Sequence, residues 1–409
     1  MMVKYILYII WLFIPMTGMA QNLDFYLQEA AENNPGLRSK FHSYMASLER
    51  VGQVKPLPDP QLAFGYFISP VETRVGPQKA KISISQMFPW FGFNKSKVTI
   101  AELEAKALYE EFIETRNELF YKVKNTYYEM AALATTIRLN EENLEILKSF
   151  ESNAVTRYES GRAKMVDVIR VQLQINDLTT DIKILKERKK PLIVNFNSLL
   201  NKPVDTDIMV DENLMIPKEQ LEAQDTSLFI DHPRVENLNF RLAAAVEKEK
   251  LANLSGNPNI GIGLDYLIVG KRNDVEMEEN GKNAFMPMIT LSLPIYRKKY
   301  KSTQEAAIYQ QEALLSNRRE VINDLNTLYS DAIWELKKTS AEMDLYERQI
   351  AQTDQAYILL ARTYSTAGED FEEVLRMIQQ KLKYQLAFTD AQKRYLTARA
   401  KIEWIIAKN

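Results

Sequence analysis

Cysteine and histidine, two residue types that often carry out catalysis or bind metals, are absent or scarce in this sequence of 409 residues. It contains no Cys, which excludes disulfide bonds, thiolate metal sites and a lipid attached to a cysteine. The two histidines, His42 and His232, are far apart in sequence and provide little material for a metal centre or a catalytic base. We therefore expect no bound metal, although the scattered methionines leave contact with soft metal ions open.

The sequence also lacks the motifs of common enzyme chemistry. It has no phosphate-binding glycine loop, no nucleophile elbow and no spacing typical of metal ligands. Its 52 basic and 54 acidic side chains nearly cancel, which argues against binding to nucleic acid. Carboxylates are plentiful, but on long helices they form the usual solvent-exposed face. We expect neither an enzyme nor a cofactor.

Long segments without Gly or Pro predict long helices. These segments are 93–160, 295–367 and 369–409. At about 1.5 Å per residue the longest reaches on the order of 100 Å. Within them, apolar residues spaced three and four apart form a narrow stripe, and the remaining faces are charged. This pattern is typical of helices that pack as coiled-coil hairpins while their other faces stay wet.

Prolines, glycines and turn motifs occur in the same order in both halves of the chain, which indicates a duplication. The proline pairs, 198 to 205 residues apart, are Pro35 and Pro233, Pro60 and Pro258, and Pro89 and Pro294. The turn motifs, 206 to 207 residues apart, are Tyr158 to Gly161 followed by 166–170, and Tyr364 to Gly368 followed by 372–376. We predict a first repeat at 21–200, a linker at 201–232 and a second repeat at 233–409.

Two stretches in each repeat alternate between apolar and polar residues, which predicts strands near 61–69 and 79–88 and near 258–268 and 285–294. Each is about ten residues long, the length of a tilted strand that crosses an outer membrane. A soluble sheet with one face on a core is the alternative. Against it, the surrounding helices offer only narrow apolar stripes, which they need for one another.

A sheet that spans a bilayer must close, because lipid cannot satisfy the hydrogen bonds of an open edge. The smallest such barrels have about eight strands. Four strands per chain are too few, so we expect more than one chain to contribute.

The junctions between strands and helices combine a proline with aromatic residues. They are Pro89, Trp90, Phe91 and Gly92 in the first repeat, and Pro294 and Tyr296 in the second. Aromatic rings favour the interface between membrane and water. The same rings would be unremarkable in a core, but their place at the predicted membrane boundary favours an interfacial corner.

The N-terminal residues 1–20 predict a signal peptide. Lys4 precedes an apolar run over 5–16 of about a dozen residues, shorter than the roughly 20 that span a bilayer. Gly18 and Ala20 provide the small side chains of a cleavage site. A retained membrane anchor is the alternative, which Pro15 makes less favourable. We expect an exported protein.

The order of signal peptide, helix, hairpin, long helix, turn and helix, repeated once, resembles the outer membrane efflux protein (TolC) family. The resemblance covers almost the whole mature chain, and 87–92 and the two turn motifs carry it. It implies a mainly α protein with a β-barrel portion: a homotrimer with a 12-stranded barrel in the outer membrane lipid and an α-barrel in the periplasm. It also implies a passive exit channel for efflux or type I secretion that docks to a periplasmic adaptor and an inner-membrane transporter.

In that family acidic side chains close the periplasmic tip of the channel, and the resemblance places Glu373 at this position. Arg376 stands where relatives often have a second acid, and Asp167 and Arg170 repeat the arrangement in the first copy. Our hypothesis is that ion pairs of these four residues hold the tip closed. The alternative is that Glu373 is simply solvated.

Tight turns at Gly161 and Gly368 need a residue at positive φ. With Tyr158 and Tyr364, they would form the surface that faces the adaptor. A periplasmic coiled-coil adaptor or scaffold without a pore is the alternative function. Adaptors usually carry one helical hairpin flanked by β-domains in mirror order, whereas here the hairpin is repeated.

Overall fold

The structure, a computed structural model, describes residues 23–407 except 213, 215, 217–228, 230, 275 and 368–370, and no side chains at 365–367. The predicted signal peptide therefore lies outside the described residues. The first elements are α1 (Leu23–Asn33), α2 (Pro35–Val54), β1 (Gln61–Val71), β2 (Gln78–Phe88), α3 (Phe93–Glu159) and α4 (Met165–Leu200). They are followed by α5 (Pro233–Ser255), β3 (Asn259–Val269), β4 (Ala284–Ser292), α6 (Arg297–Ala367) and α7 (Phe371–Ile405).

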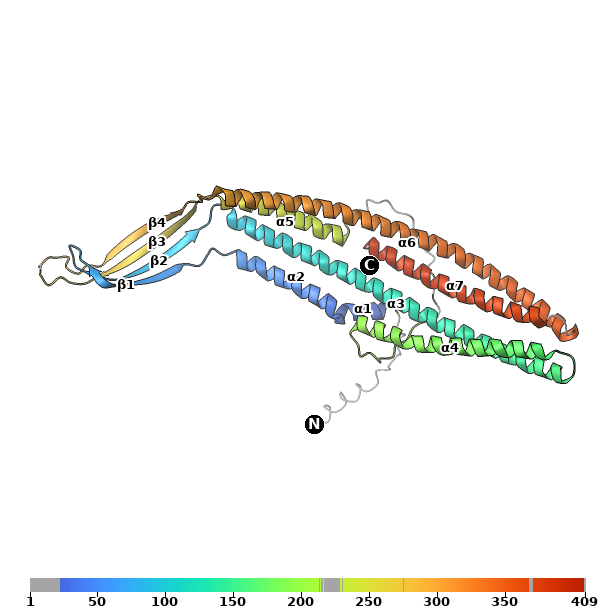
Figure 1. Ribbon diagram of the computed structural model, residues 1–409. Coiled ribbons are helices and arrows are strands. Elements are labelled where there is room, and N and C mark those ends of the chain that lie inside the picture. Colours follow the sequence, from blue (N-terminus) through green and yellow to red (C-terminus); the bar gives the residue numbers. More distant parts are fainter. Residues whose placement is uncertain are drawn as a thin grey trace, which may run out of the picture. The chain divides into compact units, whose positions relative to one another are not determined.

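The elements appear twice in the same order, since α2-β1-β2-α3-α4 is followed by α5-β3-β4-α6-α7 (Figure 1). The predicted class of long helical hairpins in two repeats, each with a β-hairpin, is confirmed. All four strands lie at the predicted positions. The end of α4 and the start of α5 coincide with the predicted limits of the linker, although the division into domains stays a prediction.

The chain divides into two compact units that each draw on both repeats. The strand unit comprises 39–114 and 230–323, and it holds the four strands with the helices next to them. The tip unit comprises the described parts of 1–38, 115–229 and 324–409, and it holds the helical hairpins formed by α3 with α4 and by α6 with α7.

The long helices follow from the distribution of helix breakers. The longest two, α3 with 67 residues and α6 with 71, fill the two long segments that contain no Gly or Pro. The start of α5 is defined by Pro233 in the first turn and by His232, whose Nδ1 accepts a hydrogen bond from the backbone N–H of Arg234 at 3.1 Å. Burial lowers the pKa of His232 to about 4, with a smaller contribution from the positive charge of Arg234.

The four strands form one antiparallel sheet in the order β1-β2-β3-β4, so that β2 and β3 join the two repeats. The register pairs Leu62 with Ile84 and Ile84 with Leu264, which aligns the predicted apolar rows on one face. In the described part of the chain, β1 and β4 have a neighbouring strand on one side only.

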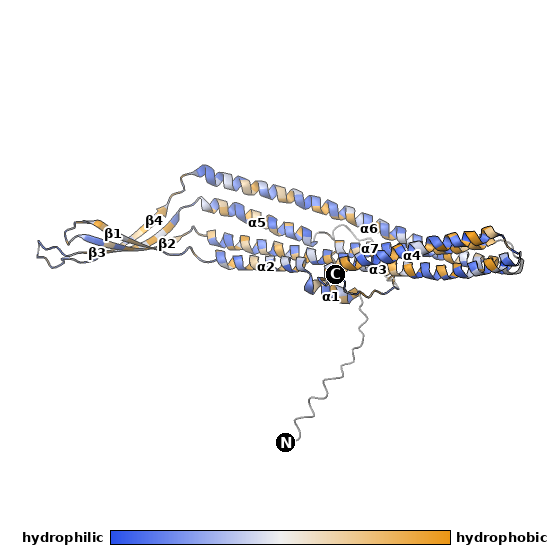
Figure 2. Cartoon of the chain, turned by 60° about the horizontal axis from the view of Figure 1, so that its bottom comes forward, coloured by the Kyte–Doolittle hydropathy of each residue, from blue (hydrophilic) through white to orange (hydrophobic). Residues whose placement is uncertain are grey.

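The aligned apolar face is open to the surroundings, and Figure 2 shows apolar residues along the strands. Phe64 is 77% exposed, Ile68 92% and Ile289 83%. The opposite face is polar: Asp265 of β3 is fully covered and forms an ion pair with Lys81 of β2. Such alternation fits a sheet with lipid on one side and a polar interior on the other.

Two loops at the far end of the strands pack closely on each other. Gly76 has a φ of +130°, and a Cβ built there would lie 1.9 Å from the carbonyl oxygen of Gly270. The N–H of Gly281 donates to the carbonyl of Val75 at 2.7 Å. Only glycine therefore fits at position 76.

None of the described helices has an apolar stretch that could cross a bilayer.

Candidate functional site: helix tips and membrane corner

The tips of the two helical hairpins in the tip unit share one apolar core. Its buried members come from all four helices: Leu147, Ala154, Val168, Val171, Leu178, Ile182, Tyr364, Phe371, Val374, Leu375 and Ile378. Both turn motifs contribute, since Val168 is 3% exposed, Val374 is fully buried and Leu375 is 3% exposed. The stripe of residues three and four apart therefore serves to join the two hairpins, as predicted for a coiled coil.

Arg157 joins the last turn of α3 to the last turns of α6. Its Nη2 donates to the backbone oxygen of Tyr364 at 3.0 Å, and its guanidinium lies 4.2 Å from the centre of the Tyr364 ring. The ring of Tyr364 also contacts the ring of Phe371 of α7, with ring centres 5.4 Å apart. Sequence reasoning did not identify Arg157, because nothing in the turn motif distinguishes this arginine from the other charged residues of α3.

Arg170 joins α4 to α7. Its Nη1 lies 2.8 Å from Oε2 of Glu372 and 3.8 Å from Oδ1 of Asp167 on its own helix. The predicted aperture residues Asp167 and Arg170 are thus brought together. The acidic partner from the second repeat is Glu372 instead of its neighbour Glu373, because successive residues of a helix point about 100° apart.

Glu373 and Arg376 form an ion pair with each other on α7. Both are exposed, with 41% and 64% of the side chain accessible. No further ion pair of these two side chains is found among the described residues. Within one chain the pair therefore does not join separate helices, and a role in closing the tip requires a neighbouring chain.

The first turn has the predicted geometry at Gly161, whose φ is +69°. A Cβ built there would meet no atom within 4 Å, so the backbone conformation alone favours glycine. Gly368 lies outside the described residues. The two matching tyrosines differ: Tyr364 is 8% exposed and contacts Arg157, whereas Tyr158 is 46% exposed and is not a member of the apolar core.

The predicted membrane corner lies in the strand unit where β2 passes into α3 and β4 into α6 (Figure 1). Phe91 is 84% and Tyr296 77% exposed, while Pro89, Trp90 and Pro294 are half-buried. The φ of Gly92 is +84°, and its carbonyl accepts from the N–H of Ser96 at 2.9 Å in the first turn of α3. Gly92 thus permits the sharp change of direction from strand to helix.

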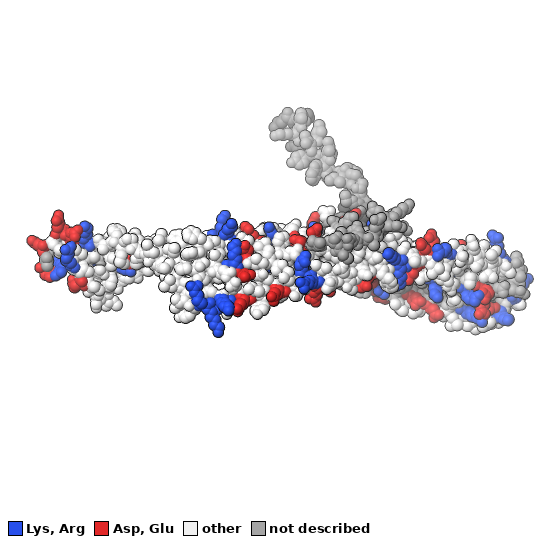
Figure 3. Space-filling model, turned by 90° about the horizontal axis from the view of Figure 1, so that it is seen from above, with Lys and Arg blue, Asp and Glu red and all other residues white. Residues whose placement is uncertain are grey.

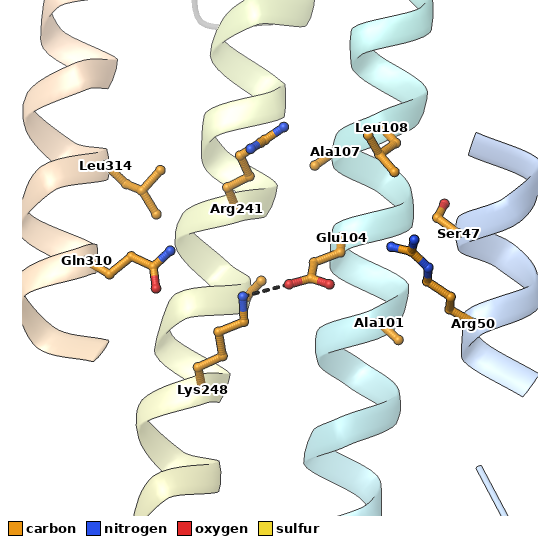
Figure 4. A pocket seen from close by; sticks show the side chains of 11 residues that line it. Ser47, Arg50, Ala101, Glu104, Ala107, Leu108, Arg241, Lys248, Gln310 and Leu314 are labelled. Carbon is orange, nitrogen blue, oxygen red and sulfur yellow. Dashed lines mark ion pairs between the residues drawn. The ribbon is translucent and has the colours of Figure 1, made fainter. Parts of the chain in front are cut away.

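A cavity of about 240 Å³ lies between helices of the strand unit, but its lining residues do not form a catalytic site. Figure 4 shows it between α2, α3, α5 and α6, with Lys248 paired to Glu104 at 2.6 Å. Arg50 and Arg241 are its other charged residues. The lining combines small side chains with paired charges and holds no nucleophile next to a base. The arrangement is that of helix packing.

The fold is that of bacterial outer membrane channels. It is similar to the outer membrane protein VceC of Vibrio cholerae, with a TM-score of 0.76, 16% identity and coverage of 94% of this chain and 96% of that one. It is also similar to CusC, with a TM-score of 0.78, 14% identity and coverage of 94% of this chain and 92% of that one. The open state of the MtrE channel of Neisseria gonorrhoeae is similar with a TM-score of 0.78, 15% identity and coverage of 94% of this chain and 89% of that one. At these identities the likeness concerns the fold.

The model of the outer membrane efflux protein family matches residues 26–182, from α1 to the middle of α4. Together with the fold, this match confirms the resemblance to the outer membrane efflux protein family that is seen in the sequence. Proteins of this family are channels, so the prediction that the chain is not an enzyme is also confirmed.

A further likeness is confined to part of a much longer protein. Over 205 residues, 46% of this chain, the sequence is 24% identical to autophagy-related protein 23 of Debaryomyces hansenii. The chain spans only 22% of the length of that curated relative.

Proposed function

We propose that the chain is the outer membrane exit channel of a tripartite efflux or type I secretion system. The observation that carries the proposal is the exposed apolar face of a four-stranded sheet whose outer strands, as far as the structure describes the chain, each pair with one neighbour. The strands have 9 to 11 residues, the number that crosses an outer membrane. A soluble sheet would leave this face in water, at a cost of about 25 cal/mol per Å².

Three chains would close such a barrel with twelve strands, β4 of one chain pairing with β1 of the next. The helices would then continue into the periplasm as an α-barrel. Rotational symmetry allows this head-to-tail contact to close into a ring. In this proposal the chain moves substrate passively, and the energy comes from an inner-membrane transporter.

The tip unit would form the closed periplasmic end and the surface for an adaptor. Within each chain, Arg157 and Arg170 join the two hairpins. Glu373 and Arg376, exposed on α7, would pair across neighbouring chains, and the adaptor would separate them to open the channel. The turns with Tyr158 and Gly161, and with Tyr364 and Gly368, would be the adaptor-facing parts.

Ion conductance tests the channel directly. The purified full chain should migrate as a heat-modifiable oligomer in gels and should give discrete current steps in a planar bilayer. A monomer that stays soluble and never conducts would instead support the scaffold interpretation and overturn the proposal.

A further inference from the structure

Six cations gather at the starts of α3 and α6, next to the membrane corner. They are Lys95, Lys97, Arg297, Lys298, Lys299 and Lys301, and all are exposed. We refer to them as the basic cluster. Both helix starts lie at the C-terminal end of α5 in the strand unit. Nη1 of Arg297 donates to the carbonyl of Gly256, which follows α5, at 3.1 Å, and a Cβ built on Gly92 would lie 3.7 Å from Cδ1 of Leu254.

The basic cluster mostly lacks the acidic partners that some other cations of the strand unit, such as Lys40 and Lys248, have. Lys40 lies 2.5 Å from Glu111, and Lys248 lies 2.6 Å from Glu104. Among the described residues, Lys301 is the only member of the basic cluster with an ion pair, and its partner is Glu305 at 3.7 Å. The positive charge is therefore mostly uncompensated by this chain.

The position of these cations is also unfavourable for the helices themselves. The first turns of α3 and α6 contain no acidic residue. The backbone N–H groups at a helix start already make that end positive, so Lys95 or Lys298 there is repelled, whereas an acidic side chain would be stabilised. An external anion would offset this repulsion.

The basic cluster borders the apolar surface that the proposed function places in lipid. Figure 3 shows the strands with almost no charged side chains, between the charged loops at one end and Lys and Arg at the helix starts. Phe91, Ile295 and Tyr296, 70% or more exposed, stand between the strands and these cations. Apolar strands, an aromatic belt and then cations match the succession of acyl chains, interface and headgroups in a membrane leaflet.

From this succession we infer that the basic cluster binds the headgroups of anionic phospholipids in the periplasmic leaflet of the outer membrane. The inference rests on the proposed function, since the strands must lie in the bilayer. Lysines at a membrane surface attract anionic lipid, and the attraction weakens as salt is added. The long lysine stems allow the ammonium groups to reach phosphates while their methylene groups cover the aromatic belt.

The lipids retained by the reconstituted full-length channel test this inference. Wild type, in mixed phosphatidylcholine and phosphatidylglycerol bilayers, should hold phosphatidylglycerol in excess over its bulk share, and added salt should reduce the excess. The variant Lys95→Gln/Lys298→Gln/Lys299→Gln should lose the preference, about fivefold for each lysine removed from the surface. Lys95→Arg/Lys298→Arg/Lys299→Arg should keep it.

Matched controls separate the possible outcomes. Lys183→Gln/Lys189→Gln/Lys190→Gln removes the same charge from three exposed lysines of α4 and should leave lipid preference unchanged. Equal preference in wild type and the glutamine variant of the basic cluster, a salt-independent preference, or displacement of lipid by inorganic phosphate would each overturn the inference. Failure of the wild type to insert into pure phosphatidylcholine bilayers would instead count against the channel itself.

Discussion

Replacing Arg157 by Met should loosen the closed tip more than any other single change of charge there. The substitution keeps an apolar stem over Tyr364 but removes the hydrogen bond to its backbone oxygen at 3.0 Å and the contact of the cation with the ring. A hydrogen bond from a charged donor contributes about 1.5–3 kcal/mol, and an exposed cation on an aromatic ring about 0.5–1 kcal/mol. We expect a loss of about 2 kcal/mol or more per chain.

The pair between Arg170 and Glu372 should matter less, although its distance of 2.8 Å is shorter. Its side chains are 41% and 69% exposed, and exposed ion pairs contribute about 0.2–1 kcal/mol. If opening separates the hairpins, Arg157→Met shifts the opening equilibrium of each chain roughly 30-fold, and Arg170→Ala fivefold or less.

Single-channel conductance measures the difference. Arg157→Met should show longer and more frequent open steps than wild type, Arg170→Ala a smaller increase, and Arg376→Ala an increase only if a neighbouring chain holds its partner. Arg162→Met is the control, because it removes the same charge from an exposed residue of the same turn. An Arg157→Met channel that conducts like Arg162→Met, while still forming the oligomer, would refute the reasoning.

Two further predictions concern assembly and pH. Gly76→Ala should reduce the heat-modifiable oligomer on gels, because its Cβ would meet the Gly270 carbonyl at 1.9 Å and its φ of +130° disfavours alanine; Gly52→Ala, with no atom within 4 Å of the new Cβ, should not. Lowering the pH from 6.5 to 4 should destabilise the fold by up to about 3 kcal/mol through His232. The pKa of His232 is about 4 in the folded chain and about 6.5 in the unfolded chain, so the unfolded chain binds the proton first as the pH falls. His232→Asn keeps a helix-capping side chain without the titration, so its melting temperature should fall less over this range; an identical fall would exclude His232 as the cause.

The elements were predictable because their signals are local. Missing helix breakers define α3 and α6, and the alternation of apolar residues defines the strands together with the face that each presents. The positive φ at Gly161 followed from the needs of a tight turn. Each of these features depends on residues within one or two turns of the chain.

The contacts at the tip were predictable only in part, because they depend on the relative rotation of distant helices. Arg170 was identified, but its partner from the second repeat, Glu372, was not. The contact of Arg157 with Tyr364 spans 207 residues and left no pattern in either repeat. The need for glycine at position 76 likewise comes from a loop that lies far away in sequence.

The single-sided pairing of β1 and β4 has a consequence for biogenesis. An isolated chain in lipid would expose two rows of unsatisfied backbone groups, each group costing several kcal/mol, and in water the same edges beside an apolar face favour aggregation. The monomer is therefore stable neither in lipid nor in water. Insertion and oligomerisation should therefore occur as one event, whose rate rises steeply with the local concentration of chains and which leaves few stable half-assembled species.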